Sequence, residues 1–303
     1  MTCPLNIAGK LRHRLLRLQA HQASSFVENK FDFFSVTTPA PRVLHCQLNR
    51  PAKLNAMTLE SWRQVELRSI FEKLHEDTTY RCAVISGSGR SFSAGIDLMS
   101  FKSVLDQAEG EDPGRIAIKT RKVLRNIQQT FLSIHKCHKP VISAIHGACV
   151  GGAVDLVSAT DIRFCSSDAW FQVKETELGF AADIGTLQLL PAAIGSDSLA
   201  RDLIFTGRRL YADEAFRVGF VSRVLDSPEA TLAAALNTAK KIAENSPVAV
   251  QTSKASLLYS RNRSIEEGLR HIADLNQVML QSPDIKLAIT AALQKKKPEF
   301  PDA

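Results

Sequence analysis

The order of hydrophobic patterns along the chain limits its fold more than any other feature. Short apolar or alternating segments predict strands at residues 33–37, 43–48, 82–86, 140–145, 162–165 and 170–173. Helical spacing predicts helices from Thr58 to about Leu74, over 116–134 and from about Ala153, and the pattern is nearly all helical from Asp213 onward. A polar stretch from Asp106 to Gly114 predicts a mobile insertion. The chain is therefore expected to form an α/β core followed by a helical C-terminal region.

The composition is that of an ordinary globular protein. Of the 303 residues, 45% are hydrophobic and 23% are charged. No apolar run reaches the length of about 18 residues that spans a bilayer, so no membrane span is expected. The six cysteines are scattered, without a CxxC pair or a Cys/His cluster of metal-binding spacing. We expect reduced, buried thiols and no metal site.

The net charge of +7 is concentrated near the ends of the chain. Residues 1–27 hold four basic residues and no acid, so the rest carries +3, and a second basic cluster occupies 295–297. The remaining body is near neutral, which argues against a nucleic-acid partner. In 1–27, Leu11, Leu15 and Leu18 share one helical face, opposite Arg14 and Arg17. This pattern predicts a mitochondrial targeting segment, the alternative being a basic tail without an address. The C-terminal residues do not read Ser-Lys-Leu, the peroxisomal signal.

Three carboxylates lie among apolar or small residues. Asp155 stands between Val154 and Leu156, Asp183 follows two alanines, and Glu175 lies between them in sequence. An ionised carboxylate is costly to bury unless it is paired or used in chemistry. Taken singly, Asp183 could be a helix cap and Glu175 a surface acid, so their meaning depends on the surrounding motifs.

Two glycine-bearing turns each follow a predicted strand. One spans residues 92–98 and the other spans 146–153. Backbone N–H groups at such turns can bind a developing negative oxygen, although a tight strand-to-helix turn alone is common. Neither turn matches the glycine patterns of nucleotide phosphate loops.

Together these motifs resemble the crotonase superfamily, the enoyl-CoA hydratases and isomerases, from about Phe33 to Lys295. The matching stretches are 48–51, 53–56, 92–97, 139–147 through 151–152, 185–188, 190–191 and 212–215. The resemblance implies an α/β fold, a spiral of ββα units over 28–225, with a helical C-terminal trimerisation region over 226–303. It also implies an acyl-CoA thioester as substrate, with no separate cofactor, and assembly as a homotrimer or homohexamer.

The resemblance also assigns binding roles to residues of the two turns and the first loop. The backbone N–H groups of Ile96 and Gly152 would form the oxyanion hole for the thioester oxygen. The substrate and its CoA moiety would contact Lys53, Leu54, Asn55, Ala56, Ser93, Ala94, Gly95 and Gly151.

The carboxylates indicate which branch of the superfamily the chain is similar to. Hydratases place two glutamates around a water, whereas this chain has Asp155 at the first position and Glu175 at the second. It adds Asp183, eight positions after Glu175, and the whole pattern resembles the Δ3,5-Δ2,4-dienoyl-CoA isomerases. That reaction removes a proton from C2 and adds one at C6, which requires two carboxyl groups in opposite protonation states. Glu175 and Asp183 are the expected pair, in an order left open.

We expect Asp155 to assist as the third catalytic acid, by positioning or charge. It falls near the start of a predicted helix, where the helix dipole favours its ionised form. Three alternatives stay open: an enoyl-CoA hydratase with Asp155 and Glu175 around a water, a non-catalytic binding protein of the same fold such as an RNA-binding member, and a thioesterase or decarboxylase.

Overall fold

The structure is a computed structural model that describes residues 31–58, 66–107, 110 and 112–303. The predicted targeting segment and the predicted helical positions 59–65 lie outside the described residues. The strands are β1 (Phe34–Ala40), β2 (Val43–Leu48), β3 (Cys82–Gly87), β4 (Val141–Ile145), β5 (Ala148–Val150), β6 (Ile162–Ser166), β7 (Trp170–Gln172), β8 (Leu210–Tyr211) and β9 (Arg223–Leu225).

The helices fall into two groups. Those within the first two thirds are η1 (Pro51–Lys53), α3 (Glu66–Glu76), α4 (Leu98–Gln107), α5 (Pro113–Lys136), α6 (Gly152–Ser158), η2 (Glu175–Leu178), α7 (Thr186–Ile194), α8 (Asp197–Thr206) and α9 (Ala212–Arg217). The last third holds α10 (Pro228–Ala243), α11 (Pro247–Ser260), α12 (Ile265–Met279) and α13 (Pro283–Leu293).

Two sheets form the core. The larger has the order β1-β2-β3-β4-β6-β9 and is parallel except for the β1–β2 pair, and the smaller has the order β5-β7-β8. Single bridges from Met57 to Ile96 and from Ser93 to Cys149 continue the smaller sheet. Strands of the larger sheet are thus followed by a short strand in the second layer and then a helix. This is the ββα spiral that the sequence predicted.

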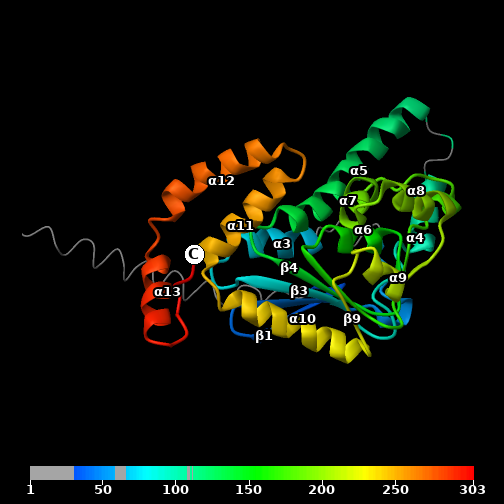
Figure 1. The fold of residues 1–303 in the computed structure, drawn as a ribbon. Helices are drawn as coiled ribbons and strands as arrows, with labels where there is room; N and C mark the ends of the chain where they lie inside the picture. Colours follow the sequence, from blue (N-terminus) through cyan, green and yellow to red (C-terminus); the bar gives the residue numbers. More distant parts are fainter. Residues whose placement is uncertain (1–30, 59–65, 108–109, 111) are drawn as a thin grey trace, which may run out of the picture.

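Helices cover both faces of the larger sheet (Figure 1). On one face α10 presents Ala235, Ala239 and Ala243, and these small side chains let the helix lie close to β3, β4 and β6. On the other face the core is filled from α3, α5 and α6, with residues such as Phe71, Phe131 and Leu156. β9 ends at Leu225, where we expected the core to end, yet α10 still packs on the sheet.

The longer strands appear where the sequence predicted them, whereas three short ones were missed. β5, β8 and β9 have only two or three residues, too few for a hydrophobic pattern, and they form by pairing with β6 or β7. Part of the polar stretch 106–114 belongs to helices: α4 continues to Gln107, and Asp112 caps α5 by accepting from the Arg115 N–H at 2.9 Å. Residues 108, 109 and 111 lie outside the described residues.

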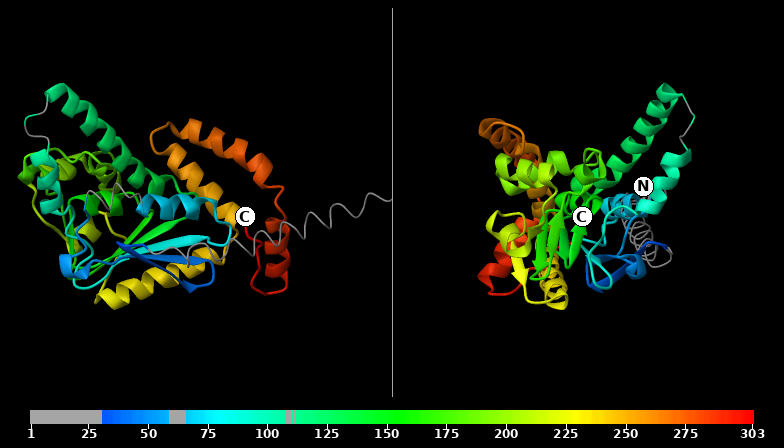
Figure 2. Two further views of the ribbon diagram at one scale, coloured as in Figure 1. Left: turned by 180° about the vertical axis from the view of Figure 1, so that it is seen from behind. Right: turned by 90° about the vertical axis from the view of Figure 1, so that its right-hand side faces the viewer.

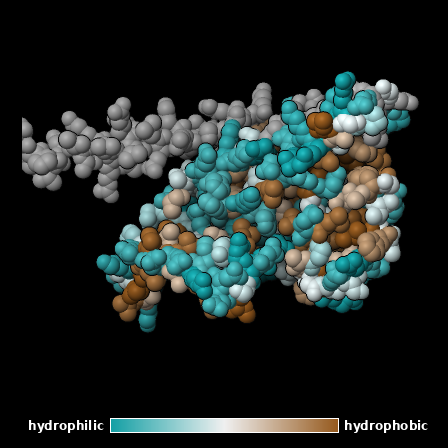
Figure 3. Space-filling model, turned by 90° about the horizontal axis from the view of Figure 1, so that it is seen from above, coloured by the Kyte–Doolittle hydropathy of each residue, from teal (hydrophilic) through white to brown (hydrophobic). Residues whose placement is uncertain are grey.

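Unlike α10, the helices α11, α12 and α13 do not cover a face of the larger sheet. α11 and α12 form a hairpin beside the core, and α13 lies at the end of the molecule (Figures 1 and 2). Large apolar side chains are exposed along α12 and α13: Ile265, Leu269, Val278, Ile289 and Leu293. Apolar side chains also gather on parts of the face seen in Figure 3. None of the described helices is long and apolar enough to cross a membrane.

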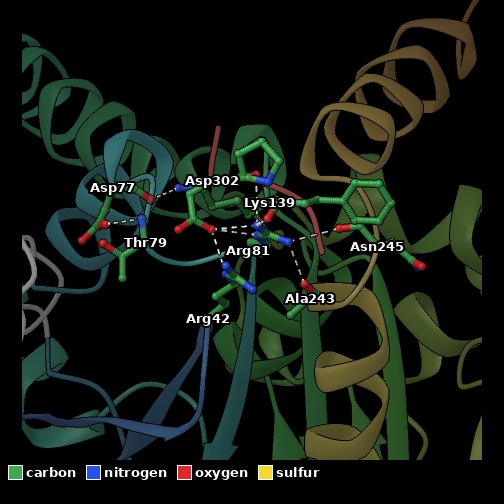
Figure 4. Close-up of polar contacts among 10 residues, drawn as sticks. Arg42, Asp77, Thr79, Arg81, Lys139, Ala243, Asn245 and Asp302 are labelled. Atoms are coloured by element: carbon green, nitrogen blue, oxygen red, sulfur yellow. Dashed lines mark hydrogen bonds and ion pairs between the residues drawn. The ribbon is translucent and has the colours of Figure 1, made fainter. Parts of the chain in front are cut away.

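A buried arginine fastens the C-terminal tail to the core (Figure 4). The Arg81 side chain is 3% exposed. Its guanidinium donates to the carbonyls of Ala243, Phe300 and Pro301 at 2.6–3.0 Å. It also pairs with the Asp302 carboxylate at 2.7 Å. The planar guanidinium can satisfy several acceptors at once, which is what allows a cation to be buried here.

Candidate active site

The two glycine turns lie side by side at the edge of the smaller sheet. The Val150 N–H donates to the Ser93 carbonyl at 3.1 Å, and the Ser93 N–H donates to the Ala148 carbonyl at 3.0 Å. Gly95 has φ +85°, and a Cβ there would lie 2.4 Å from the Val150 carbonyl oxygen. Only glycine allows this approach, and it brings the backbone after Gly95 next to the backbone around Gly151.

Two backbone donors in these turns have no protein acceptor. The Asp97 N–H donates to the Met57 carbonyl and the Gly151 N–H donates to the Gln172 carbonyl, both at 2.9 Å. Within the described part of the chain, the N–H groups of Ile96 and Gly152 make no hydrogen bond. Gly152 begins α6, where N–H groups have no helical partner. These are the two donors that the sequence predicted for an oxyanion hole.

The loop after β2 is held in shape from inside. Leu54 and Asn55 both adopt left-handed φ values, of 50° and 54°. The buried Asn55 amide donates to the carbonyls of Ser88, Ser91 and Phe92 at 2.8–3.1 Å. These contacts offset the backbone strain.

Ser93 joins this loop to the first turn. Its buried hydroxyl donates to the Asn55 carbonyl at 2.9 Å and accepts from the Gly95 N–H at 3.1 Å. Among the predicted substrate-binding residues, Asn55 and Ser93 thus use their side chains to hold the backbone of the loop and the turn in place. Lys53 is exposed, and Leu54, Ala56 and Ala94 are half-buried.

Asp155 lies on α6 and is fully buried. Its Oδ1 accepts from the Thr186 N–H at 2.5 Å, while Oδ2 is buried without a partner among the described residues. Burial, and next the charge of Glu175, raise the pKa of Asp155 to about 7, against the opposing effect of Thr186. The helix start favours the ionised form of Asp155, as the sequence indicated, but desolvation outweighs that effect and the pKa is raised.

Glu175 begins η2 and faces the second glycine turn. A Cβ on Gly151 would lie 3.1 Å from Glu175 Oε1, so this carboxyl sits against the backbone just before Gly152. Its Oε2 is buried and unpartnered among the described residues. Burial raises the pKa of Glu175, and the charge of Asp183 adds to that effect. A carboxyl whose pKa is raised, beside an open N–H donor, is suited to exchanging a proton.

Asp183 lies in the loop between η2 and α7, and its side chain is exposed. Partial desolvation still raises its pKa. Its charge in turn raises the pKa of both Asp155 and Glu175, so the three acids share one electrostatic environment. The structure therefore brings together residues 28 positions apart that the sequence had grouped as catalytic.

Two contacts to these acids were not predicted. The Thr186 N–H binds Asp155, and the Gln128 side chain of α5 donates to the Asp183 carbonyl oxygen at 2.7 Å. Thr186 lies in a motif that the sequence analysis had matched, without a role. Gln128 carries no signal in the sequence, because it is one of several polar residues on a helix 55 positions from its partner.

Comparisons with known proteins agree with this geometry. The enoyl-CoA hydratase/isomerase family pattern matches residues 40–303. A mitochondrial Delta(3,5)-Delta(2,4)-dienoyl-CoA isomerase of Mus musculus is 49% identical over 89% of this chain and 82% of its own length. A peroxisomal Delta(3,5)-Delta(2,4)-dienoyl-CoA isomerase of Arabidopsis thaliana is 41% identical over 85% of this chain and 92% of its own.

Solved structures agree on the fold. The crystal structure of an enoyl-CoA hydratase from Bacillus anthracis, 28% identical, superposes with a TM-score of 0.79 over 89% of this chain and 99% of that one. The α/β spiral with its helical C-terminal region is common to both. By sequence and by fold, this chain belongs to the enoyl-CoA hydratase/isomerase family.

Proposed function

We propose that this chain isomerises 3,5-dienoyl-CoA to 2,4-dienoyl-CoA in the beta-oxidation of unsaturated fatty acids. The mouse and Arabidopsis relatives bear this activity in their names and align over most of both chains. The observation that carries the proposal is the third acid. Asp183 shares an electrostatic environment with Asp155 and Glu175, beside two open backbone N–H groups.

The thioester oxygen binds in the oxyanion hole of Ile96 and Gly152. Both N–H groups are fixed before the substrate arrives, because the neighbouring backbone is hydrogen-bonded on either side. Donors held in this way stabilise the negative charge that develops on the oxygen when a proton leaves C2. Removing one such donor typically costs about 3–4 kcal/mol of transition-state stabilisation.

Glu175 and Asp183 carry the protons. The ionised member removes a proton from one end of the conjugated system and leaves a dienolate, whose charge spreads to the thioester oxygen. The protonated member then donates a proton at the other end, and the double bonds move by one position. No atoms are gained or lost, and the two acids exchange protonation states, which proton exchange with solvent resets. Desolvation raises the pKa of both carboxyls above its ordinary value, which makes each a better proton acceptor than a solvated carboxylate.

Asp155 influences the ionisation of this pair through its own protonation state. It is fully buried, held by Thr186, and its pKa of about 7 depends on Glu175. A neutral Asp155 lets Glu175 ionise, whereas an ionised Asp155 holds the Glu175 proton in place. The loop of Lys53–Ala56 and the turn of Ser93–Gly95, with Gly151, would then hold the CoA moiety and thioester against the hole.

The test is replacement of Asp183 by asparagine, which keeps its size and removes its proton exchange. We expect Asp183→Asn to lower the turnover of 3,5-dienoyl-CoA by about 10²–10⁴-fold. The assay follows the ultraviolet absorbance of the conjugated 2,4-product, and CoA affinity should stay unchanged. Asp197→Asn, at an exposed position on α8, is the matched control. Near-normal turnover by the Asp183 variant, with fast hydration of 2-enoyl-CoA, would instead assign Asp155 and Glu175 to holding a water.

The chain is also proposed to assemble as a homotrimer or homohexamer through its C-terminal helices. Large apolar side chains on α12 and α13, such as Leu269, are more than half exposed in the single chain, which favours their burial against further copies. Light scattering should give three or six copies for the wild type. Leu269→Lys should shift that mass toward the monomer, whereas Glu266→Lys on the same helix should not.

We further propose the mitochondrial matrix as destination. The mouse relative is named as mitochondrial and the Arabidopsis relative as peroxisomal. The basic segment 1–27 favours the first, and fusing it to a fluorescent protein tests it directly. Peroxisomal signal from the full-length fusion would contradict this assignment.

A further inference from the structure

Asp183 is held differently from the other two acids. Asp155 belongs to a helix and Glu175 to a helical turn, and both side chains are buried. Asp183 lies in an irregular loop between the buried residues Ala182 and Ile184, but its own side chain is exposed, so packing does not fix the carboxyl. An acid that must meet one carbon atom of a bound chain needs an accurate position, since a displacement of about 1 Å can cost roughly 100-fold in rate.

One side chain supplies that position from outside the loop. Gln128 Nε2 donates to the backbone carbonyl oxygen of Asp183 at 2.7 Å. The bond acts on the main chain of Asp183, so it fixes the Cα from which the carboxyl projects. A second contact holds the start of the same loop, where Phe180 packs against Phe101 of α4 with ring centroids 5.6 Å apart.

The helix that carries Gln128 has its own anchor. α5 buries Ile127, Phe131 and Ile134 in the main core. The side chain of the neighbouring Gln129 is exposed and makes no hydrogen bond among the described residues. Gln128 is therefore not needed to keep α5 in place, and its amide is free to serve the loop.

We propose that Gln128 is a positioning residue for Asp183 in the isomerisation. This inference rests on the proposed function, because it assigns Gln128 to the geometry of that proton transfer. Gln128 acts through Asp183 and need not touch the substrate itself. Its loss should therefore lower kcat, leave KM within about twofold, and slow proton exchange at only one of the two reacting carbons.

The experiment compares five variants on 3,5-dienoyl-CoA, namely three single substitutions at Gln128 and Gln129, the single Asp183→Asn, and a double variant. Gln128→Ala removes the donor and should lower kcat by about 10–100-fold. Gln128→Lys restores an N–H donor at the end of a flexible side chain and should recover part of that loss. Gln129→Ala is the matched control and should behave as wild type. In the double variant, Gln128→Ala should add little to Asp183→Asn, because the acid it positions is already gone.

Two further readouts separate the outcomes. In deuterated water, Gln128→Ala should slow deuterium entry at C2 or at C6, but not equally at both. Its crystal structure should show Asp183 displaced. Unchanged kcat and an unmoved Asp183, or a full additional loss on top of Asp183→Asn, would overturn the inference. A wild type that hydrates 2-enoyl-CoA but fails to isomerise would overturn the proposed function instead, while the crystal structure would still report whether Gln128 holds the loop.

Discussion

Asp155 illustrates how its surroundings can overrule its position in a helix. The sequence correctly marks it as an acid among apolar neighbours, but a helix start alone predicts a low pKa. The structure raises the pKa to about 7, because the carboxyl is fully buried and near Glu175. Burial depends on how α6 packs in the finished fold, so this shift could not be predicted from neighbouring residues.

That raised pKa makes the stability of the fold depend on pH. The folded Asp155 keeps its proton up to about pH 7, whereas in the unfolded chain it ionises near the ordinary pKa of 3.8 for an aspartate. Between these values the folded state binds more protons, so this contribution to stability falls as pH rises and levels off above pH 7. Asp155→Asn removes this titrating group. The free energy of unfolding of the variant minus that of the wild type should therefore be higher at pH 8 than at pH 4, by on the order of 3 kcal/mol.

Thermal or urea unfolding of both proteins between pH 4 and pH 8 measures this difference. Asp197→Asn, on the exposed face of α8, serves as the control and should leave the pH dependence unchanged. Equal pH profiles for wild type and Asp155→Asn would show that Asp155 ionises normally in the folded protein.

At the scale of elements, the glycine turns were predictable and their contact was not. The sequence places a turn after β3 and another after β4, because each strand is a continuous apolar run. That Gly95 lies against the Val150 carbonyl depends on the three-residue strand β5, which carries no pattern of its own. The oxyanion hole thus follows from the pairing of two short segments 55 residues apart.

Alanine substitutions at two glycines can separate the effect of the Gly95–Val150 contact from the effect of backbone strain. Gly95 and Gly179 have nearly equal φ values, +85° and +87°, but a Cβ at Gly179 would meet nothing within 4 Å. Gly179→Ala should cost about 1 kcal/mol of stability from strain alone. Gly95→Ala adds a clash with Val150 that must push the two turns apart. We expect it to cost about 3 kcal/mol or more and to abolish turnover, as urea unfolding and the isomerase assay would measure. Equal effects of the two substitutions would contradict the close approach.

At the scale of the whole molecule, Arg81 ties the start of β3 to the end of the described chain. Nothing in the sequence around Arg81 distinguishes it from an exposed arginine, since its acceptors lie 162–221 positions away. The strands of the larger sheet other than β9 were predictable from hydrophobic patterns, and the resemblance to the crotonase superfamily implied their arrangement as a ββα spiral. The fastening of the tail was not predictable, because it rests mainly on backbone carbonyls that any residue could supply.

Removal of residues 300–303 should therefore destabilise the whole fold. The buried guanidinium would keep only the carbonyls of Ala243 and Asn245 as partners. We expect a loss of about 3 kcal/mol, measured by urea unfolding, because a buried cation is left partly unpaired. Arg42→Ala is the control: this arginine also pairs with Asp302 but is 40% exposed, so its loss should cost less than about 1 kcal/mol. Equal losses would show that Arg81 is not truly buried.

The same fastening sets an order of events during synthesis. The 221 positions between Arg81 and Asp302 take roughly 10–45 s to be added at about 5–20 residues per second. Throughout that time the acceptors of Phe300, Pro301 and Asp302 do not yet exist, and water takes their place around the guanidinium. The nascent chain can pair most of its strands early, but the contacts of Arg81 with Phe300, Pro301 and Asp302 can form only once residues 300–302 have been added.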